Sequence, residues 1–372
     1  MNNPTITTQS PGRINIIGEH TDYNEGFVLP AAIDKKATFQ LKKNGTTNTV
    51  NITATNLEEH YSFELANFKP LKEGWQNYVM GVVKELQNIG ANFSGFDAEF
   101  SGDVPIGSGM SSSAALECSM AYGLNKLFDL GFDKWQLIKA AQMAEHNFVG
   151  TKCGIMDQFA SMMGQKNQVM LLDCRSLDFK YFPFDLGNYQ LLLLNTNVSH
   201  SLSSTEYNTR RAECLEGVAT IKKRYPEKEI NSLRDISFDM LIQATKELSP
   251  TIFNRCKHII LENNRVLQAT EALVSKDFNQ LGKLVYKSHF SLQNDYEVSC
   301  KELDFLVQQT LDKDYILGSR MMGGGFGGCT ITIIEKKWVD AFTELVTKNY
   351  KTHTGIDLTP YTVSIENGTE LI

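Results

Sequence analysis

Residues 12–24 read Gly-Arg-Ile-Asn-Ile-Ile-Gly-Glu-His-Thr-Asp-Tyr-Asn, and this stretch is the most informative part of the 372-residue chain. Ile14 and Ile16 alternate with a polar residue, which predicts a strand. Two carboxylates, an imidazole, a phenol and an amide follow at once, between residues 19 and 24. Together, side chains of these types can form hydrogen bonds with both the donors and the acceptors of a hydroxyl-rich ligand such as a sugar. The stretch therefore predicts a strand that delivers a polar binding cluster, and the alternative is a polar turn after an edge strand.

A second motif, residues 103–115, reads Asp-Val-Pro-Ile-Gly-Ser-Gly-Met-Ser-Ser-Ser-Ala-Ala. Apolar residues follow it at helical spacing, namely Leu116, Met120, Leu124 and Leu127. The loop is thus expected to precede a helix, where glycines allow close approach and free amides attract phosphate oxygens. The lysine of a Walker loop is missing. By its chemistry alone the loop could also be an ordinary serine-rich helix cap.

A third motif, residues 323–328, reads Gly-Gly-Gly-Phe-Gly-Gly and runs into a predicted strand over residues 329–334. One tight turn explains one or two of these glycines but not five. The surplus indicates close backbone packing at a site, and the alternative is a flexible loop.

Length and composition favour a two-domain globular enzyme. A chain of 372 residues exceeds the size at which one core keeps growing. The formal net charge of −7 disfavours a nucleic-acid partner or an anionic membrane. Seven cysteines without a CxxC pair suit reduced thiols rather than disulfides or a zinc site. The first ten residues lack a basic region and an apolar stretch, so we expect a cytoplasmic protein without a membrane segment.

Periodicity outlines an α+β chain. A helix is predicted from the stripe that begins at Trp75 and ends before Gly90, strands over residues 169–172 and 190–195, and mainly helices over residues 208–311. We place the domain boundary between residues 174 and 189. Residues 42–48 are expected to form a hairpin turn that carries surface lysines.

Taken together, the three motifs resemble those of the GHMP small-molecule kinases, and the first is similar to the galactokinase signature in particular. Supporting stretches are residues 75–79, 144–146, 153–159 and 207–214, so the resemblance covers nearly the whole chain. It implies an N-terminal α/β domain of the ribosomal protein S5 domain 2 type over residues 1–178. It also implies a C-terminal ferredoxin-like domain over residues 179–372, whose last strand, about residues 360–372, could pack back on the first domain. The active site is expected in the cleft between them.

The resemblance further implies ATP-dependent phosphorylation of the anomeric C1 hydroxyl of α-D-galactose to galactose 1-phosphate, the first committed step of galactose catabolism. Asp157 matches the catalytic aspartate and Arg13 the catalytic arginine. A free aspartate is a weak base toward an alcohol, so we expect proton transfer late in the reaction and position to matter more than basicity. Arg13 would offset charge on the γ-phosphoryl group, and the alternative is a strand cation at the surface.

The other implied site residues fall into three groups. The sugar ligands are Glu19, His20, Asp22, Gly154, Asp157 and Tyr207. The ATP site comprises Trp75, Gly107, Ser108, Gly109, Met110, Ser111, Ser112 and Ser113. The implied Mg²⁺ ligands are Ser113 and Glu145, with Ser112 as a substitute for the serine. Trp75 is equally well explained as a core residue of its helical stripe.

Two positions depart from the family pattern, and two other functions stay open. Met322 stands where threonine is common, and Glu25 where glycine is frequent, which leaves fine substrate preference in doubt. One alternative is a kinase of N-acetylgalactosamine or another hexose. The other is a non-catalytic sensor of galactose and ATP, against which the complete serine run of residues 111–113 argues. Galactose and ATP are the expected partners, and no obligate protein partner is inferred.

Overall fold

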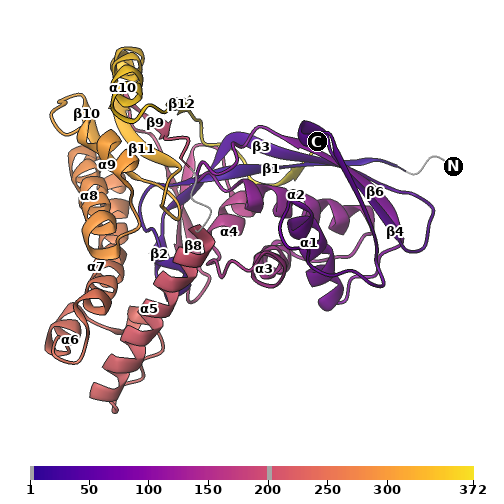
Figure 1. Cartoon of the computed structure of the whole chain (residues 1–372), viewed down its shortest axis with the longest axis horizontal. Helices are drawn as coiled ribbons and strands as arrows, with labels where there is room; N and C mark the ends of the chain where they lie inside the picture. Colours follow the sequence, from indigo (N-terminus) through magenta and orange to yellow (C-terminus); the bar gives the residue numbers. More distant parts are fainter. Residues whose placement is uncertain (1–3, 199–202) are drawn as a thin grey trace.

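The N-terminal half is built on a six-stranded sheet in the computed structural model, which describes residues 4–198 and 203–372 (Figure 1). Its strand order is β13-β1-β3-β6-β4-β5. The strands are β1 (Ile6–Asn15), β3 (Pro30–Lys43), β4 (Thr49–Ala54), β5 (Glu59–Glu64), β6 (Phe96–Gly102) and β13 (Glu370–Leu371). All neighbours are antiparallel except β4 and β6, which are parallel. The pairing of β13 with β1 returns the end of the chain to this sheet.

Helices cover one face of the six-stranded sheet (Figure 1). They are α1 (Gln76–Asn88), α2 (Ser112–Leu127), α3 (Lys134–Ala144), a π-helical turn (Glu145–Val149) and α4 (Met156–Met163). In β3, Phe39 and Leu41 are fully buried beneath these helices, whereas Gln40 and Lys42 on the other face are partly or fully exposed. This alternation is the period of a strand with one covered face, so the hydrophobic pattern positions α2 and α4 against β1.

The C-terminal half is built on a four-stranded antiparallel sheet of order β10-β11-β9-β12. Its strands are β9 (Tyr189–Asn195), β10 (Ile316–Met321), β11 (Cys329–Glu335) and β12 (Thr359–Thr362). This order, with helices between β9 and β10 and between β11 and β12, is the expected ferredoxin-like arrangement. The helices are α5 (Ser203–Arg224), α6 (Phe238–Gln243), α7 (Pro250–Val274), α8 (Phe278–Ser291), a π-helical turn (Leu292–Tyr296), α9 (Lys301–Gln308) and α10 (Val339–Thr354).

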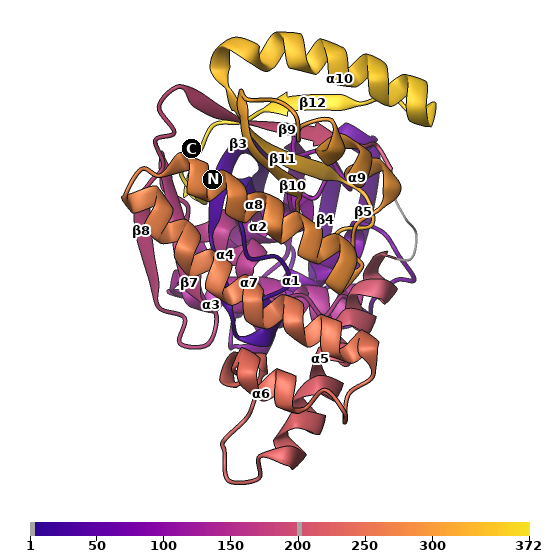
Figure 2. The ribbon, with the colours of Figure 1, turned by 90° about the vertical axis from the view of Figure 1, so that its left-hand side faces the viewer.

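Strand β9 shows how the second half is packed. Leu191 and Leu193 face a core shared with α7 and α8, whereas Leu192 and Leu194 face a core shared with α9 and α10. Figure 2 shows α7 and α8 at the front of the view and α10 along its top, beside β12. The first of these cores also contains Ile14 and its neighbours from the end of β1. The two halves are therefore joined by a hydrophobic core directly beside the polar end of β1.

A three-stranded sheet of order β2-β7-β8 lies beside the junction of the halves. It comprises β2 (Phe27–Val28), β7 (Gln168–Asp173) and β8 (Phe179–Pro183). Strand β8 pairs with β7 in a hairpin, so a boundary drawn at residue 178 separates two paired strands. The division between residues 178 and 179 stays a prediction. It would place the paired strands β7 and β8 in different domains.

Most predicted elements are confirmed, including the helix after Trp75, the helix after the serine loop and the strands at residues 169–172 and 190–195. The hairpin predicted at residues 42–48 is wrong, because β6 lies between β3 and β4 in the sheet. The segment instead passes over the start of β6, where the Asn44 amide donates to Gly95 O and Gly95 N donates to Thr46 O. The residue types of a turn cannot reveal that a strand from later in the chain lies between the two strands that the turn connects.

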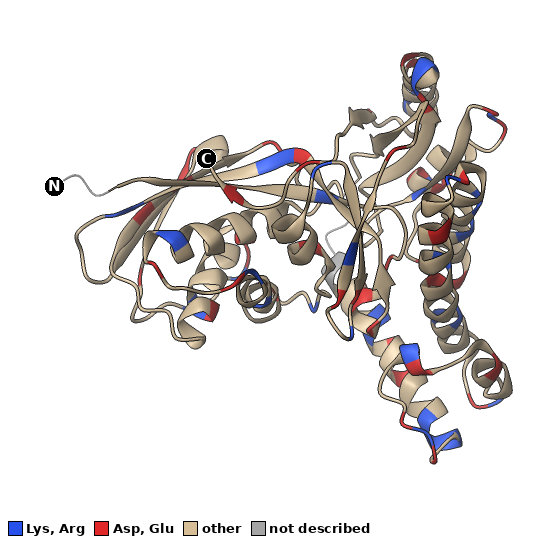
Figure 3. Ribbon diagram, turned by 180° about the vertical axis from the view of Figure 1, so that it is seen from behind, with Lys and Arg blue, Asp and Glu red and all other residues tan. Residues whose placement is uncertain are grey.

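The described residues also bear on the cysteine and membrane predictions. All seven cysteines lie in the described ranges and are free thiols. Within residues 4–198 and 203–372, no helix has both the length and the apolar character that crossing a bilayer requires. Acidic and basic residues are interspersed along the helices of the C-terminal half (Figure 3).

Candidate active site

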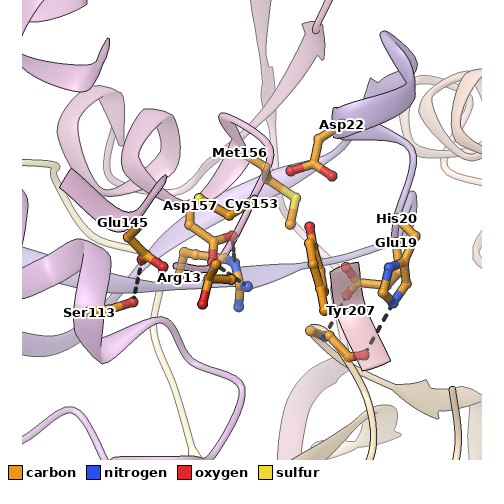
Figure 4. Close-up of a pocket in the computed structure, with 13 residues that line it drawn as sticks. Arg13, Glu19, His20, Asp22, Ser113, Glu145, Cys153, Met156, Asp157 and Tyr207 are labelled. Atoms are coloured by element: carbon orange, nitrogen blue, oxygen red, sulfur yellow. Dashed lines mark hydrogen bonds and ion pairs between the residues drawn. The ribbon is translucent and has the colours of Figure 1, made fainter. Parts of the chain in front are cut away.

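A cavity of about 120 Å³ lies between the two halves, at the polar end of β1 (Figure 4). Its lining from the N-terminal half consists of Arg13, Glu19, His20, Asp22, Ser113, Glu145, Thr151, Cys153, Met156 and Asp157. Its lining from the C-terminal half consists of Tyr207, Gly323 and Gly324. All three sequence motifs therefore meet in one cavity, although more than 300 residues separate the first from the last.

Arg13 and Asp157 form a two-pronged ion pair in this cavity (Figure 4). Arg13 Nε donates to Asp157 Oδ1 at 2.9 Å, and Nη2 donates to Oδ2 at 3.0 Å. Ser111 Oγ donates to the same Oδ2 at 2.6 Å. Burial opposes the charge of Arg13, but the carboxylates of Asp157, Glu19 and Asp22 outweigh it and raise the pKa of the guanidinium. Asp157 stands in the first turn of α4, and the hydrogen bonds from Arg13 and Ser111 hold its carboxylate as a fixed acceptor.

Ser113 and Glu145 form a second polar pair, on the N-terminal side of the cavity (Figure 4). Ser113 Oγ donates to Glu145 Oε1 at 2.8 Å, and Gln158 Nε2 lies 3.4 Å from the same oxygen. Burial raises the pKa of Glu145 to about 7 against the opposing effect of the Ser113 hydrogen bond. Among the described residues no cation pairs with Glu145. A buried carboxylate beside a hydroxyl is a donor set of hard oxygens that fits Mg²⁺.

Asp22 faces the cavity from the short helix Asp22–Asn24. Burial raises the pKa of Asp22 to about 7, and the nearby carboxylates of Asp157 and Glu19 act in the same direction. Backbone amides of Tyr23 and Met156 donate to its carboxylate. A Cβ atom at Gly154 would lie 1.9 Å from Asp22 Oδ2. Glycine at position 154 is therefore what allows Asp22 to occupy this place.

His20 is held by a directional chain of hydrogen bonds. Its Nε2 lies 3.2 Å from the carbonyl oxygen of Gly324, which can only accept, so Nε2 carries the proton. Nδ1 therefore accepts from Tyr23 Oη at 2.8 Å, and Tyr23 in turn accepts from Tyr296 Oη at 2.8 Å. Burial lowers the pKa of His20 to about 3. The neutral ring ties the first motif to the glycine-rich loop.

Glu19 is fixed by donors from the C-terminal half. Its Oε1 accepts from Arg320 Nη1 at 3.0 Å and from Gly323 N at 2.8 Å. Both side chains are buried, Arg320 completely. The carboxylate is thus oriented by β10 and by the start of the glycine-rich loop.

The glycine-rich loop and the serine loop pack backbone against backbone. A Cβ atom at Gly328 would lie 3.0 Å from the Ser108 carbonyl oxygen, and φ there is +78°. A Cβ atom at Gly109 would lie 2.8 Å from the Met322 carbonyl oxygen. The predicted close packing at residues 323–328 is confirmed, because side chains at these positions would separate the two loops.

A second, mostly apolar cavity of about 350 Å³ adjoins the first. Its walls include Leu57, Trp75, Tyr78, Phe100, Val104, Ile106 and Leu116, together with Ser112 and Ser113. Trp75 Nε1 donates to Glu59 Oε2 at 2.6 Å, and its ring meets Phe100 edge-on at 5.1 Å. Ser113 lines both cavities, so a ligand with an apolar ring and an anionic chain could span them across the N-terminus of α2.

The predicted sugar, metal and catalytic residues line the first cavity, except for Gly154 and the substitute serine Ser112. Two predicted ATP ligands direct their side chains away from the cavities. Ser108 and Met110 are completely buried. Ser108 Oγ donates to Pro105 O at 2.6 Å, and Met110 packs in the core between the halves. At both positions only the backbone could meet a phosphate. Ser111, with φ of 58°, directs its hydroxyl to Asp157.

The two departures from the family pattern have structural explanations. Met322 is completely buried in the core between the halves and does not line the sugar-sized cavity. Glu25 adopts a left-handed backbone with φ of 58°, which explains why glycine suits the position. Its carboxylate accepts from Arg175 Nε at 2.8 Å.

Several residues of the site were not singled out from sequence. Arg320, Gln158, Glu117, Thr151 and Met156 line the cavity or support its carboxylates. Arg320 is a charged residue in an otherwise uncharged strand just before the glycine run, which is the one signal that could have marked it. Gln158 Nε2 bridges Glu145 to the buried Glu117, whose pKa is raised by burial.

The chain is similar to known kinases over most of its length. Residues 77–165 match the family model of the GHMP kinases N terminal domain, residues 269–351 that of GHMP kinases C terminal, and residues 1–43 the galactokinase galactose-binding signature. The galactokinase of Clostridium tetani is 44% identical over 97% of this chain and 92% of its own. The galactokinase of Thermotoga maritima is 39% identical over 99% of this chain and all of its own.

Solved structures give the same grouping. The crystal structure of Lactococcus lactis galactokinase complexed with galactose is 34% identical, with a TM-score of 0.92 over 98% of this chain and 95% of that one. Methanococcus jannaschii mevalonate kinase, at 17% identity, has a TM-score of 0.68 over 98% of this chain and 99% of its own. The second likeness concerns the fold alone.

Proposed function

The chain belongs to the galactokinase family of GHMP kinases, and on that premise we propose that it transfers the γ-phosphoryl group of ATP to the C1 hydroxyl of α-D-galactose. It is a sugar kinase, and ATP-dependent phosphorylation of galactose is its reaction. Asp157 acts as the base, and Arg13 stabilises charge on the transferred group. The observation that carries these roles is the two-pronged Arg13–Asp157 pair, which faces the same cavity as Glu19 and Asp22.

In this mechanism the C1 oxygen forms a bond to the γ-phosphorus while the bond from that phosphorus to the β,γ-bridging oxygen breaks. ADP leaves with the electron pair of the broken bond, and the hydroxyl proton passes to Asp157. Because the transition state is loose, proton transfer comes late and the main contribution of Asp157 is to align the hydroxyl. Arg13 and Ser111 fix that carboxylate from two sides.

The sugar is held by Glu19, Asp22 and Tyr207, around the ends of β1 and α5. Carboxylates accept hydrogen bonds from pairs of hydroxyl groups, so Asp22 or Glu19 can recognise the axial hydroxyl that distinguishes galactose from glucose. A sugar that lacks this partner leaves a buried carboxylate unpaired, which costs more than a lost methylene contact. His20 supports the site by holding the Gly324 carbonyl.

ATP occupies the apolar cavity and the N-terminus of α2. Trp75 and its neighbours would enclose the adenine, and the free amides of residues 112–114 would meet the phosphates. Ser113 Oγ and a Glu145 carboxylate oxygen would hold Mg²⁺, with Ser112 as a substitute for the serine. The metal, when bound, neutralises charge on the β- and γ-phosphates. Glu145 fits this role because its buried carboxylate has no cation partner in the described ranges.

The direct test of these roles replaces each member of the pair. Asp157→Asn keeps the shape but cannot take a proton, and we expect kcat to fall about 10²- to 10⁴-fold while galactose binding survives. Arg13→Lys keeps the charge but loses the two-pronged contact, and kcat should again fall. Asp340→Asn, at the exposed start of α10, is the matched control and should keep kcat. A normal kcat in Asp157→Asn would refute the assignment.

A further inference from the structure

Arg320 is the largest completely buried side chain in the described part of the protein. It stands on β10 of the C-terminal half, yet its guanidinium reaches the end of β1 in the N-terminal half. Nε donates to Ile16 O at 2.9 Å, and Nη2 donates to Asn15 O. Nη1 donates to Glu19 Oε1 at 3.0 Å. One cation thus joins both halves at the point where the sugar motif begins.

The two carboxylate oxygens of Glu19 differ in their hydrogen-bond partners. Oε1 accepts from Arg320 and from Gly323 N, which lies 2.8 Å away. None of the residues in the described ranges donates to Oε2. Because Glu19 lines the sugar-sized cavity, Oε2 is the oxygen left for a ligand hydroxyl. The carbonyl groups of Asn15 and Ile16, at and just after the end of β1, hold the guanidinium in place, so the carboxylate has little freedom to rotate.

We propose that Arg320 is a positioning residue for galactose: it holds Glu19 through Oε1 so that Oε2 receives a sugar hydroxyl. The inference rests on the proposed role of Glu19 in sugar binding. It implies that the C-terminal half contributes to sugar affinity through β10 as well as through Tyr207. The arginine needs its planar fork, because it must meet the backbone carbonyls of Asn15, Ile16 and Met321 and one carboxylate together. A lysine retains the charge but cannot make these four contacts in the same directions.

The first experiment measures KM for galactose, KM for ATP and kcat in Arg320→Lys. Loss of a charge-assisted hydrogen bond to the sugar predicts a KM for galactose that rises about 10- to 100-fold. KM for ATP should change less than about twofold, because the apolar cavity lies away from β10. An unchanged KM for galactose would overturn the inference. Arg255→Lys is the matched control, since Arg255 is also a buried ion-pair arginine of the C-terminal half and should leave KM for galactose unchanged.

A double-mutant cycle separates positioning from general destabilisation. In Glu19→Gln the oxygen that faces the sugar is replaced by a donor, so sugar affinity is already reduced. If Arg320 acts through Glu19, adding Arg320→Lys to this variant should change KM for galactose less than about twofold. Additive losses would overturn the inference. A normal KM for galactose in Glu19→Gln alone would instead refute the proposed sugar contact of Glu19, and the inference with it.

If the Arg320 variants do not fold, Glu19→Asp tests whether galactose binding depends on the fixed position of Glu19 Oε2. The shorter carboxylate can reach either Arg320 and Gly323 or the sugar, but not both. We therefore expect KM for galactose to rise about 10-fold or more although the negative charge is kept. A KM for galactose within about twofold of the parent protein would show that the fixed position of Oε2 does not matter.

Discussion

Asp22 makes galactose binding depend on pH in a direction that follows from its surroundings. Its pKa is raised to about 7, first by burial and then by the carboxylates of Asp157 and Glu19, against the opposing backbone amides of Tyr23 and Met156. Sugar hydroxyl groups donate to a carboxylate and so stabilise its ionised form. Galactose should therefore bind the ionised form of Asp22 and release a proton near neutral pH.

The size of the effect follows from the ionised fraction. With a pKa of about 7, roughly 9% of Asp22 is ionised at pH 6 and roughly 91% at pH 8. The apparent affinity for galactose should thus rise about 10-fold between these two values. In the protein without galactose, the free energy of unfolding changes with pH in the opposite direction to the affinity for galactose. The folded state holds the proton up to pH 7, whereas the unfolded state loses it near pH 4, so stability falls as pH rises through this window.

The assay is calorimetric titration with galactose, without nucleotide or metal, at pH 6, 7 and 8. Two buffers with different ionisation enthalpies reveal the proton released, which should be about half a proton per site at pH 7. Asp22→Asn is the control, because an amide does not titrate in this range and its weaker affinity should be flat with pH. An affinity for galactose that is flat in the parent protein, or a proton taken up on binding, would refute the reasoning.

Three further substitutions test separate parts of the site. Gly154→Ala places a Cβ 1.9 Å from Asp22 Oδ2 and so displaces that carboxylate. KM for galactose should rise about 10- to 100-fold while KM for ATP stays unchanged. An unaltered KM for galactose would show that Asp22 is not needed at this place. Trp75→Ala removes a wall of the apolar cavity and should raise KM for ATP about 10-fold but not KM for galactose, which steady-state kinetics can check. Glu145→Ala should raise the Mg²⁺ concentration that half-maximal activity requires, and an identical Mg²⁺ titration would remove Glu145 from the metal site.

Local sequence chemistry accounts for most of the site. The polar run after Ile16, the serines before α2 and the glycines at residues 323–328 each predict a binding function within a few residues. The structure gathers them in one cavity because β1, α2 and β11 meet at the joint between the halves. Strands and helices with clear periodicity, such as α1 and β9, were predictable for the same local reason.

The rest depends on contacts between distant residues. Nothing near Arg320 in the sequence indicates that its partner is Glu19, 301 positions away. Likewise, the insertion of β6 between β3 and β4 is decided by a later segment, so the turn at residues 42–48 was assigned to the wrong strand pair. Ser108 was assigned to the ATP site because its loop resembles the family motif, but its hydroxyl donates to the Pro105 carbonyl within the loop.

The position of the transferred phosphate tests the central proposal most directly. Purified protein is incubated with Mg-ATP and galactose, and the product is examined by ³¹P NMR together with ADP release, with N-acetylgalactosamine, glucose, mevalonate and homoserine in parallel. We expect ADP release with galactose, a phosphorus signal coupled to the anomeric proton, and loss of both in Asp157→Asn. A phosphate coupled to the C6 protons, or full turnover in Asp157→Asn, would contradict the proposal.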